Sequence, residues 1–310
     1  MSQAKSHLFP IGLIGCGIWG QNILRDLISL QAEVWVVDPD PKKLELAKKI
    51  GAQKTFLEIP IEQMPEGWIV SSPASTHHEV LLSLFPLGKP IYVEKPLTCS
   101  YPEAKNLIQK ATVPVFVMHN WRYHRGVRLL TEIAHSKELG ELVLIKSNRC
   151  NWTSPRSDVD SVWTLIPHDI TIAFNILGYF PKPIAAVVEE YKGVQRGMTA
   201  LLGGKPACIM EVSNRYADKR REIRLHFTEG VAVLKNEQVD FIEIFHGDDR
   251  SKPEEMRLEI RKFEPIPPLY DELQSFLNYV RGGASPLTPL EEGVEVIRII
   301  DELKKLANHP

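Results

Sequence analysis

The sequence is poor in cysteine, with four in 310 residues, and none of them form a C-x-x-C pair. This excludes a zinc ribbon and a thioredoxin-type redox motif. A chain of this size needs no disulfide framework, so we expect it in the reducing cytoplasm. No run approaches the roughly 18 apolar residues that span a bilayer, and no membrane partner is expected. The apolar run from Leu8 to Trp19 contains Pro10 and three glycines, which indicates a buried strand entering a glycine turn and not a signal peptide.

An excess of charge of either sign is also missing. Lys and Arg number 37 against 39 Asp and Glu, which gives a formal net charge of -2. This balance excludes a globally basic nucleic-acid-binding protein. The 44% hydrophobic content excludes a disordered chain. At about 150 residues per domain, the length predicts about two domains.

The first part of the chain alternates strand-like and helical segments. Apolar or β-branched runs predict strands at 9–14, 33–37, 68–71, 91–94 and 113–118. Helical periodicity follows at 18–30, 42–50, 76–85 and 101–110. Helices of about ten residues between apolar strands are typical of a parallel sheet with right-handed crossovers. We therefore predict that residues 1–120 form an α/β Rossmann domain with a doubly wound parallel sheet.

The pattern changes after about residue 120. Helices are predicted at 126–135, 166–177, 269–281 and 290–306. Strands are predicted at 142–150, 184–191, 207–215, 221–227, 232–234, 239–245 and 256–263. Hairpin-like turns such as Glu229-Gly230 join several of them. Residues 121–310 are therefore predicted to form an α+β domain with an open, mainly antiparallel sheet faced by helices.

A glycine fingerprint follows the first predicted strand and opens the first helix. It reads Gly15-Cys16-Gly17-Ile18-Trp19-Gly20, a G-x-G-x-x-G in which glycine permits a tight turn and a close approach to a pyrophosphate. The phosphates then lie at the positive end of the helix. Asp38 ends the next strand, where its carboxylate can accept both adenosine ribose hydroxyls and repel a 2′-phosphate. We therefore expect NAD, in preference to NADP, bound by Gly15, Gly17, Ile18, Trp19, Gly20 and Asp38.

Three later motifs carry a family resemblance. Ser72-Pro73-Ala74-Ser75-Thr76-His77-His78 and Glu94-Lys95-Pro96 each follow a predicted strand, and Trp163-Thr164-Leu165-Ile166-Pro167-His168-Asp169 comes later. With the fingerprint, they make almost the whole chain resemble the glucose-fructose oxidoreductase / inositol dehydrogenase (Gfo/Idh/MocA) family. The Glu-Lys-Pro is the most specific element.

The resemblance implies an NAD(P)-dependent oxidoreductase that acts on the CH–OH group of a sugar. It implies that Lys95 contacts the nicotinamide ribose and the substrate hydroxyl, and that His168 accepts the hydroxyl proton. Ser72, Pro73, His77 and Glu94 would lie with Lys95 at the cofactor. The resemblance also implies an open C-terminal sheet that mediates a homodimer or homotetramer, and no metal. The roles agree with the chemistry, because alcohol oxidation needs a base and a cation beside the developing alkoxide.

One position departs from the family pattern. Many members carry Asp four residues before the histidine, where this chain has Thr164. The branch that oxidises the 3-hydroxyl of UDP-N-acetylglucosamine or its uronic acid often has a hydroxyl residue there, so we favour a nucleotide-sugar dehydrogenase. The alternatives are an inositol, free-sugar or dihydrodiol dehydrogenase, and a regulatory protein that senses a dinucleotide without turnover. The presence of both Lys95 and His168 argues against the last.

Six residues of the second domain are candidates for substrate binding, three at its start and three in the later strand end and motif. They are Arg122, Tyr123, His124, Asn151, Thr164 and His168. Arginine forms bidentate bonds with diphosphates and carboxylates. A solvated helix face for the arginines and a packing role for Tyr123 and His124 remain open alternatives. The histidines match no zinc spacing, and the basic run Lys219-Arg220-Arg221 is predicted to be a solvated turn.

Overall fold

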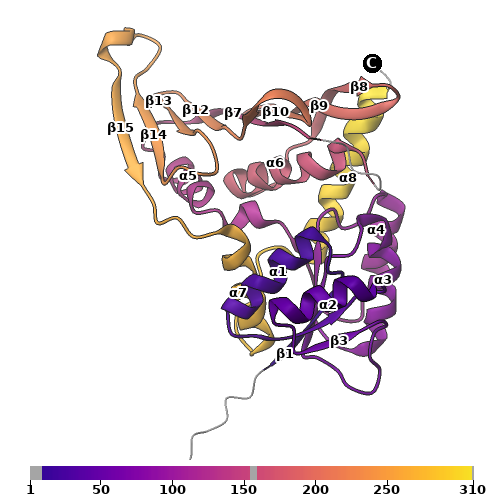
Figure 1. The fold of residues 1–310 in the computed structure, drawn as a ribbon. Helices are drawn as coiled ribbons and strands as arrows, with labels where there is room; N and C mark the ends of the chain where they lie inside the picture. Colours follow the sequence, from indigo (N-terminus) through magenta and orange to yellow (C-terminus); the bar gives the residue numbers. More distant parts are fainter. Residues whose placement is uncertain (1–8, 154–158, 309–310) are drawn as a thin grey trace, which may run out of the picture. The chain divides into compact units, whose positions relative to one another are not determined.

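The computed structural model describes residues 9–153 and 159–308 of the chain. These residues divide into two compact units, which Figure 1 colours by position in the sequence. The first unit contains the chain up to Met118 together with Leu269–Val294. The second contains His119–Pro268 and the chain from Glu295 onwards.

The first unit is built on a six-stranded parallel sheet. Its strands are β1 (Pro10–Ile14), β2 (Glu33–Val37), β3 (Lys54–Phe56), β4 (Gly67–Val70), β5 (Ile91–Glu94) and β6 (Val115–Met118). They lie in the order 3-2-1-4-5-6 and every neighbouring pair is parallel. This is the strand order of dinucleotide-binding Rossmann sheets, in which ligands bind beyond the carboxyl ends of the strands. The predicted doubly wound sheet is confirmed.

Helices connect these strands as crossovers. They are α1 (Ile18–Ser29), α2 (Pro41–Ile50), α3 (His77–Leu84) and α4 (Tyr101–Lys110). The boundaries of α2 follow from its sequence, because Asp40 caps the first turn by accepting from the amide of Lys42 at 2.9 Å and Gly51 ends the helix at a φ of 126°. These local signals explain why the sequence located this helix closely.

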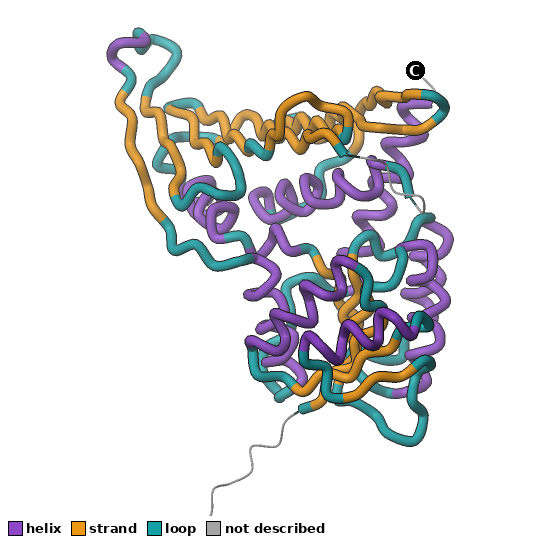
Figure 2. The backbone as a smooth tube through the Cα atoms, in the orientation of Figure 1, coloured by secondary structure: helices purple, strands orange, loops and turns teal. Residues whose placement is uncertain are grey.

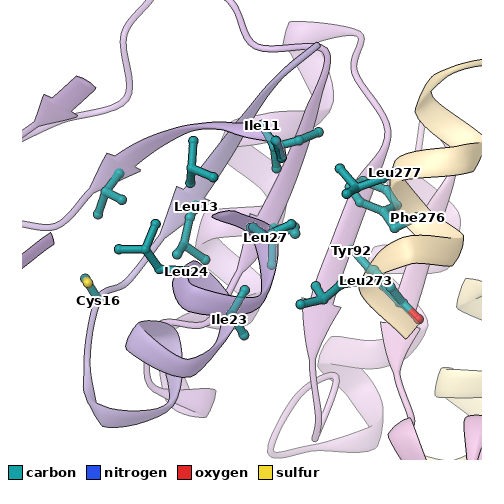
Figure 3. Close-up of a cluster of buried hydrophobic side chains, with 14 of the residues drawn as sticks. Ile11, Leu13, Cys16, Ile23, Leu24, Leu27, Tyr92, Leu273, Phe276 and Leu277 are labelled. Carbon is teal, nitrogen blue, oxygen red and sulfur yellow. The ribbon is translucent and has the colours of Figure 1, made fainter. Parts of the chain in front are cut away.

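The core of the first unit brings together segments from both ends of the chain (Figure 3). Its labelled side chains come from β1, the turn after β1, α1, β5 and α7 (Pro268–Val280). They are Ile11, Leu13, Cys16, Ile23, Leu24, Leu27, Tyr92, Leu273, Phe276 and Leu277. The ring of Phe276 lies 5.1 Å from that of Tyr92. The sequence analysis assigned all residues after 120 to the second domain, whereas α7 and the segment up to Val294 fold with the Rossmann sheet. The cause is the apolar stripe of α7, which covers Tyr92.

The second unit contains a nine-stranded sheet. Its strands are β7 (Leu142–Trp152), β8 (Pro183–Tyr191), β9 (Val194–Gly203), β10 (Ala207–Ser213), β11 (Arg215–Arg220), β12 (Ile223–Phe227), β13 (Gly230–Leu234), β14 (Phe241–His246) and β15 (Arg257–Lys262). The order is 15-14-13-12-7-10-9-8, with β11 paired to β7. Only the β7–β10 pairing, among the described residues, is parallel. The predicted mainly antiparallel sheet is confirmed, and Figure 2 shows its strands in one layer.

Helices α5 (Arg125–Ser136) and α6 (Ser161–Leu177) lie along this sheet (Figure 1). The side chains of β10 alternate accordingly, with Cys208, Met210 and Val212 buried and the residues between them partly exposed. Helix α8 (Leu290–Asn308) closes the chain, and its later residues belong to this unit. No helix within the described ranges has the length and apolar character to cross a membrane.

Three strands, β3, β9 and β11, were not predicted, and Lys219 and Arg220 belong to β11 and not to the predicted turn. β3 has three residues, too few to show a hydrophobic period, and the apolar pattern of β9 is interrupted by Gly197 and Thr199. Helix α6 begins at Ser161, five residues before the predicted start, because Asp160 accepts from the amides of Val162 and Trp163. Pro167 therefore lies inside the helix.

Candidate active site

The glycine fingerprint forms the turn between β1 and α1. Gly15 has a φ of +91°, and a Cβ there would overlap the backbone of Ser71 and Ser72 at the end of β4. A Cβ at Gly20 would overlap the carbonyl oxygen of Gly15. At Gly17, by contrast, an added Cβ would meet no heavy atom within 4 Å. The turn is therefore closed toward the protein and open over Gly17, as the close approach of a pyrophosphate requires.

The first turn of α1 leaves its amides to a ligand. Gly17 is the N-cap, without a side-chain cap, and the turn contains no acidic residue. The side chains of Ile18 and Trp19 are 87% and 44% exposed. A helix start that lacks an anion of its own fits a phosphate group.

Asp38 follows β2 and lies under the fingerprint turn. Its Oδ2 accepts from the Cys16 amide at 2.8 Å, and its Oδ1 accepts from the Asp40 amide at 2.9 Å. Lys43 is 3.6 Å from Oδ2. Each carboxylate oxygen has further lone pairs for ribose hydroxyls. The residues after β1 and β2 therefore fit the phosphate and ribose groups of a dinucleotide.

The Glu-Lys-Pro motif follows β5 at the same edge of the sheet. Glu94 Oε2 accepts from the Lys95 amide at 3.1 Å, and its Oε1 accepts from the indole of Trp19. The Lys95–Pro96 peptide bond is cis. The structure therefore brings together the fingerprint and Lys95, two elements that lie 75 residues apart, through the side chains of Trp19 and Glu94.

His77 fixes the loops that follow β4 and β5. Its ring is buried, with Nδ1 2.9 Å from the Pro96 carbonyl oxygen and Nε2 3.0 Å from that of Ser72. The hydroxyl of Ser72 is 2.8 Å from that of Thr76, and Pro73 is exposed. Ser72, Pro73 and His77 thus lie at the predicted edge, where His77 positions loop backbone.

A buried carboxyl that the sequence analysis missed lies behind this edge. Glu272 of α7 is fully buried, and burial together with the nearby charge of Glu94 raises its pKa well above the usual range. The hydroxyl of Tyr92 acts in the opposite direction. The signal in the sequence was an acidic residue within the apolar stripe of Leu269, Leu273 and Phe276.

Replacing Glu272 with glutamine should reduce the loss of folding stability that accompanies a rise in pH. A carboxyl whose folded pKa is raised contributes stability below its unfolded pKa of about 4.3, and this contribution is lost as the pH rises through the folded pKa. In that interval the variant should gain about 1.4 kcal/mol over the wild type per pH unit. Melting temperatures of both proteins between pH 4.5 and 8 measure this gain, and a difference that stays constant with pH would contradict the assignment.

The second group of candidate residues lies on α6. His168 is 9% exposed, and Thr164, one turn earlier, donates from Oγ1 to the Ser161 carbonyl at 3.0 Å. Asp169 is buried and accepts from Arg149 Nε of β7 at 2.8 Å. This ion pair fixes the segment of α6 that carries His168.

Arg149 also links β7 to the residues that begin this unit. Its guanidinium lies 4.2 Å from the ring centroid of Trp121, whose ring stacks on that of His124 at 4.9 Å and an angle of 8°. His124 is buried and accepts from the Gly126 amide through Nδ1 at 3.1 Å. Burial lowers the pKa of His124, so the neutral ring caps α5.

The other predicted substrate residues lie at different places. Arg122 donates from Nε to Asn175 Oδ1 at 3.2 Å, two turns along α6 from His168. Tyr123 is buried under the guanidinium of Arg128. Asn151, near the end of β7, accepts from Arg221 at 3.3 Å. Of these residues, Asn151 lies on the same strand as Arg149, two positions away.

The second unit also contains a cavity of about 210 Å³, which is lined by His124, Arg125, Glu237 and Phe263 among others. In the part of the chain that the structure describes, no group of three or more His, Cys, Asp or Glu side chains is placed to hold a metal ion. Lys95 lies in the first unit and His168 in the second.

The sequence of the first unit matches a known protein family. Residues 9–115 match the model of the Gfo/Idh/MocA family, described as an oxidoreductase family with an NAD-binding Rossmann fold. An inositol 2-dehydrogenase from Azotobacter vinelandii is 31% identical over 149 residues. That alignment covers 44% of this chain and 44% of the relative, so the chain matches less than half of the relative's length.

Solved structures extend the likeness in fold to nearly the whole chain. A levoglucosan dehydrogenase in complex with NADH and levoglucosan superposes with a TM-score of 0.83 at 16% identity, covering 97% of each chain. A UDP-N-acetylglucosamine 3-dehydrogenase from Acidithiobacillus ferrooxidans gives a TM-score of 0.81 at 19% identity, covering 96% of this chain and 97% of that one. At these identities the likeness establishes the fold.

Proposed function

We propose that this chain, whose residues 9–115 match the Gfo/Idh/MocA oxidoreductase family model, is a member of that family and an NAD-dependent dehydrogenase that acts on a secondary hydroxyl of a sugar. The observation that supports it most is the edge of the parallel sheet. There the fingerprint turn, Asp38 and the Glu94-Lys95 motif follow β1, β2 and β5, and Trp19 joins the first to the last.

A bound nicotinamide would supply the acceptor for the hydride that leaves the substrate carbon. The residues of the chain have the remaining tasks. The ammonium of Lys95 stabilises negative charge on the substrate oxygen, and Glu94 holds the Lys95 amide. His168 accepts the hydroxyl proton, a task that imidazole side chains commonly perform as general bases. Asp169 and Arg149 position the helix that carries His168.

Two substrate classes follow from different observations. Thr164 in place of an acidic residue favours a nucleotide sugar, and the chain shares its fold with a UDP-N-acetylglucosamine 3-dehydrogenase. The sequence likeness to an inositol 2-dehydrogenase favours an inositol or a free sugar as the second candidate.

We further propose a homodimer or homotetramer formed through the nine-stranded sheet, whose outer strands expose Val187 and Leu258. Light scattering after size exclusion tests the assembly.

A substrate panel tests the activity. The absorbance of NADH is followed with UDP-sugars, free sugars, sugar acids and inositol, and turnover of at least one is expected. Binding of NAD without turnover of any member would contradict the proposed activity and favour a dinucleotide-sensing regulatory protein.

We expect NADH to bind at least about tenfold more tightly than NADPH, a difference of about 1.4 kcal/mol. The reason is repulsion between the Asp38 carboxylate and the 2′-phosphate of NADPH. The nearby cation Lys43 is paired with this carboxylate, so it is not held ready for the phosphate. Fluorescence titration of both cofactors measures the ratio. In Asp38→Ser the ratio should approach one, and tighter binding of NADPH to the wild type would overturn the NAD preference.

A further inference from the structure

The end of β7 carries two polar residues on one face of the sheet. Arg149 and Asn151 are two positions apart and therefore lie on the same side of the strand. This is the side of α6, because Arg149 pairs with Asp169 of that helix. Asp169 directly follows His168, the proposed base, so this end of β7 lies beside the turn of α6 that carries the base.

Arg221 lies at the same place, although the sequence analysis assigned it to a solvated turn. It connects β11 to β12, which both pair with β7, and its side chain is partly buried. One guanidinium nitrogen donates to the carbonyls of Cys150 at 2.9 Å and Arg220 at 2.8 Å. The other donates to Asn151 Oδ1 at 3.3 Å. The prediction for Arg221 was wrong because spacing alone did not show that the strand pairing turns this side chain against β7.

The acceptors that hold Arg221 are all neutral. Among the described residues, no carboxylate forms an ion pair with it, whereas Arg149 is paired with Asp169 and Glu237 with Lys219. Burial and the charge of Arg149 lower the pKa of Arg221, and the charges of Glu237, Asp169 and Cys150 oppose this. A partly buried cation held by neutral groups is stabilised by an anion that replaces the lost water.

We propose that Arg221 is an anion-binding residue of the substrate pocket, and that the sugar carries an acidic group, a carboxylate or a phosphate, which this guanidinium binds. Asn151 and the carbonyl of Cys150 keep the guanidinium in place at the end of β7. This inference rests on the proposed sugar dehydrogenase activity and specifies its substrate class. It differs from the predicted role of Arg122, which is held at the far end of α6.

Steady-state kinetics on matched substrates test the proposal. The pairs are glucose with glucuronate, glucose with glucose 6-phosphate, and N-acetylglucosamine with UDP-N-acetylglucosamine. In at least one pair the wild type should prefer the acidic member by about tenfold or more in kcat/KM. Arg221→Gln should lower kcat/KM for that member by about 10- to 100-fold, mainly through KM, as expected for loss of a hydrogen bond to a charged group. Arg221→Lys should recover part of this loss. The pair that responds tells a carboxylate from a phosphate.

Arg220→Gln is the matched control, because this neighbouring side chain is exposed and pairs with Asp218. It should leave both members of each pair within about twofold, since exposed ion pairs contribute little. An equal loss for neutral and acidic members in Arg221→Gln, or no preference of the wild type in any pair, would overturn the proposal. If no substrate is turned over, the proposed activity fails. Calorimetric titration of glucuronate, glucose 6-phosphate and UDP-N-acetylglucosamine into the NADH-bound wild type and Arg221→Gln still decides the role of Arg221, with equal affinity or no binding counting against it.

Discussion

Replacing Lys95 with methionine is expected to lower kcat by about a thousandfold, because the ammonium is the cation next to the reacting oxygen in the proposed mechanism. Methionine keeps most of the length of the side chain, so the loop that Glu94 holds should remain in place. The affinity for NADH should change by less than about threefold, since binding of the pyrophosphate depends on the glycine turn and the start of α1.

Two measurements separate these effects. The absorbance of NADH gives kcat with the best panel substrate, and fluorescence titration gives the cofactor affinity. Lys110→Met is the control, because Lys110 is exposed at the last turn of α4 and should leave both quantities unchanged. Unchanged turnover in Lys95→Met would refute the assigned role. A large loss of cofactor affinity would instead assign Lys95 to dinucleotide binding.

Removing either partner of the Arg149–Asp169 ion pair should have the largest effect on stability. Both side chains are almost fully buried, at 3% and 1% exposed, and their atoms are 2.8 Å apart. Asp169→Ala leaves an arginine buried without its counter-charge, which costs about 3–5 kcal/mol of the free energy of unfolding. Since folded proteins are stable by only about 5–15 kcal/mol, we expect a clear fall in the urea midpoint of the second unit.

A double variant distinguishes the charge effect from a packing effect. Arg149→Met with Asp169→Leu removes both charges and should cost less than Asp169→Ala alone, because no uncompensated ion remains. Lys137→Ala, in the exposed Lys137–Glu141 pair, is the control and should cost less than about 1 kcal/mol. If the double variant is the less stable, the pair acts through shape and not through charge.

The sequence predicted the elements that have strong local signals. Strands β2 and β5 and helix α4 have the predicted bounds, since an apolar run or a capped periodic segment fixes each of them. Elements whose formation depends on partners, such as β3 and β9, were missed. Their residues form strands because a neighbouring strand supplies the hydrogen bonds, and no local pattern records that neighbour.

The candidate site divides in the same way. Sequence motifs predicted Gly15–Gly20, Asp38 and Glu94-Lys95 as site residues, because glycine conformation and the position after a strand are local properties. The contact of Trp19 with Glu94, the clamp formed by His77 and the burial of Glu272 join segments far apart in the chain. In the sequence, the run Lys219-Arg220-Arg221 looks like a solvated basic turn. Only the pairing of β11 and β12 with β7 shows that the Arg221 side chain is partly buried.

By itself, the sequence determined the Rossmann unit, and it predicted a dinucleotide cofactor and the two residues proposed for the chemistry. It did so because the spacing of turns, caps and apolar runs is set by the backbone of each element. Only the tertiary structure decided that α7 belongs to the first unit and which carboxyls and guanidiniums are buried. Burial, and with it the balance of charge around Glu272, Asp169 and Arg221, depends on which distant segments exclude water from a side chain.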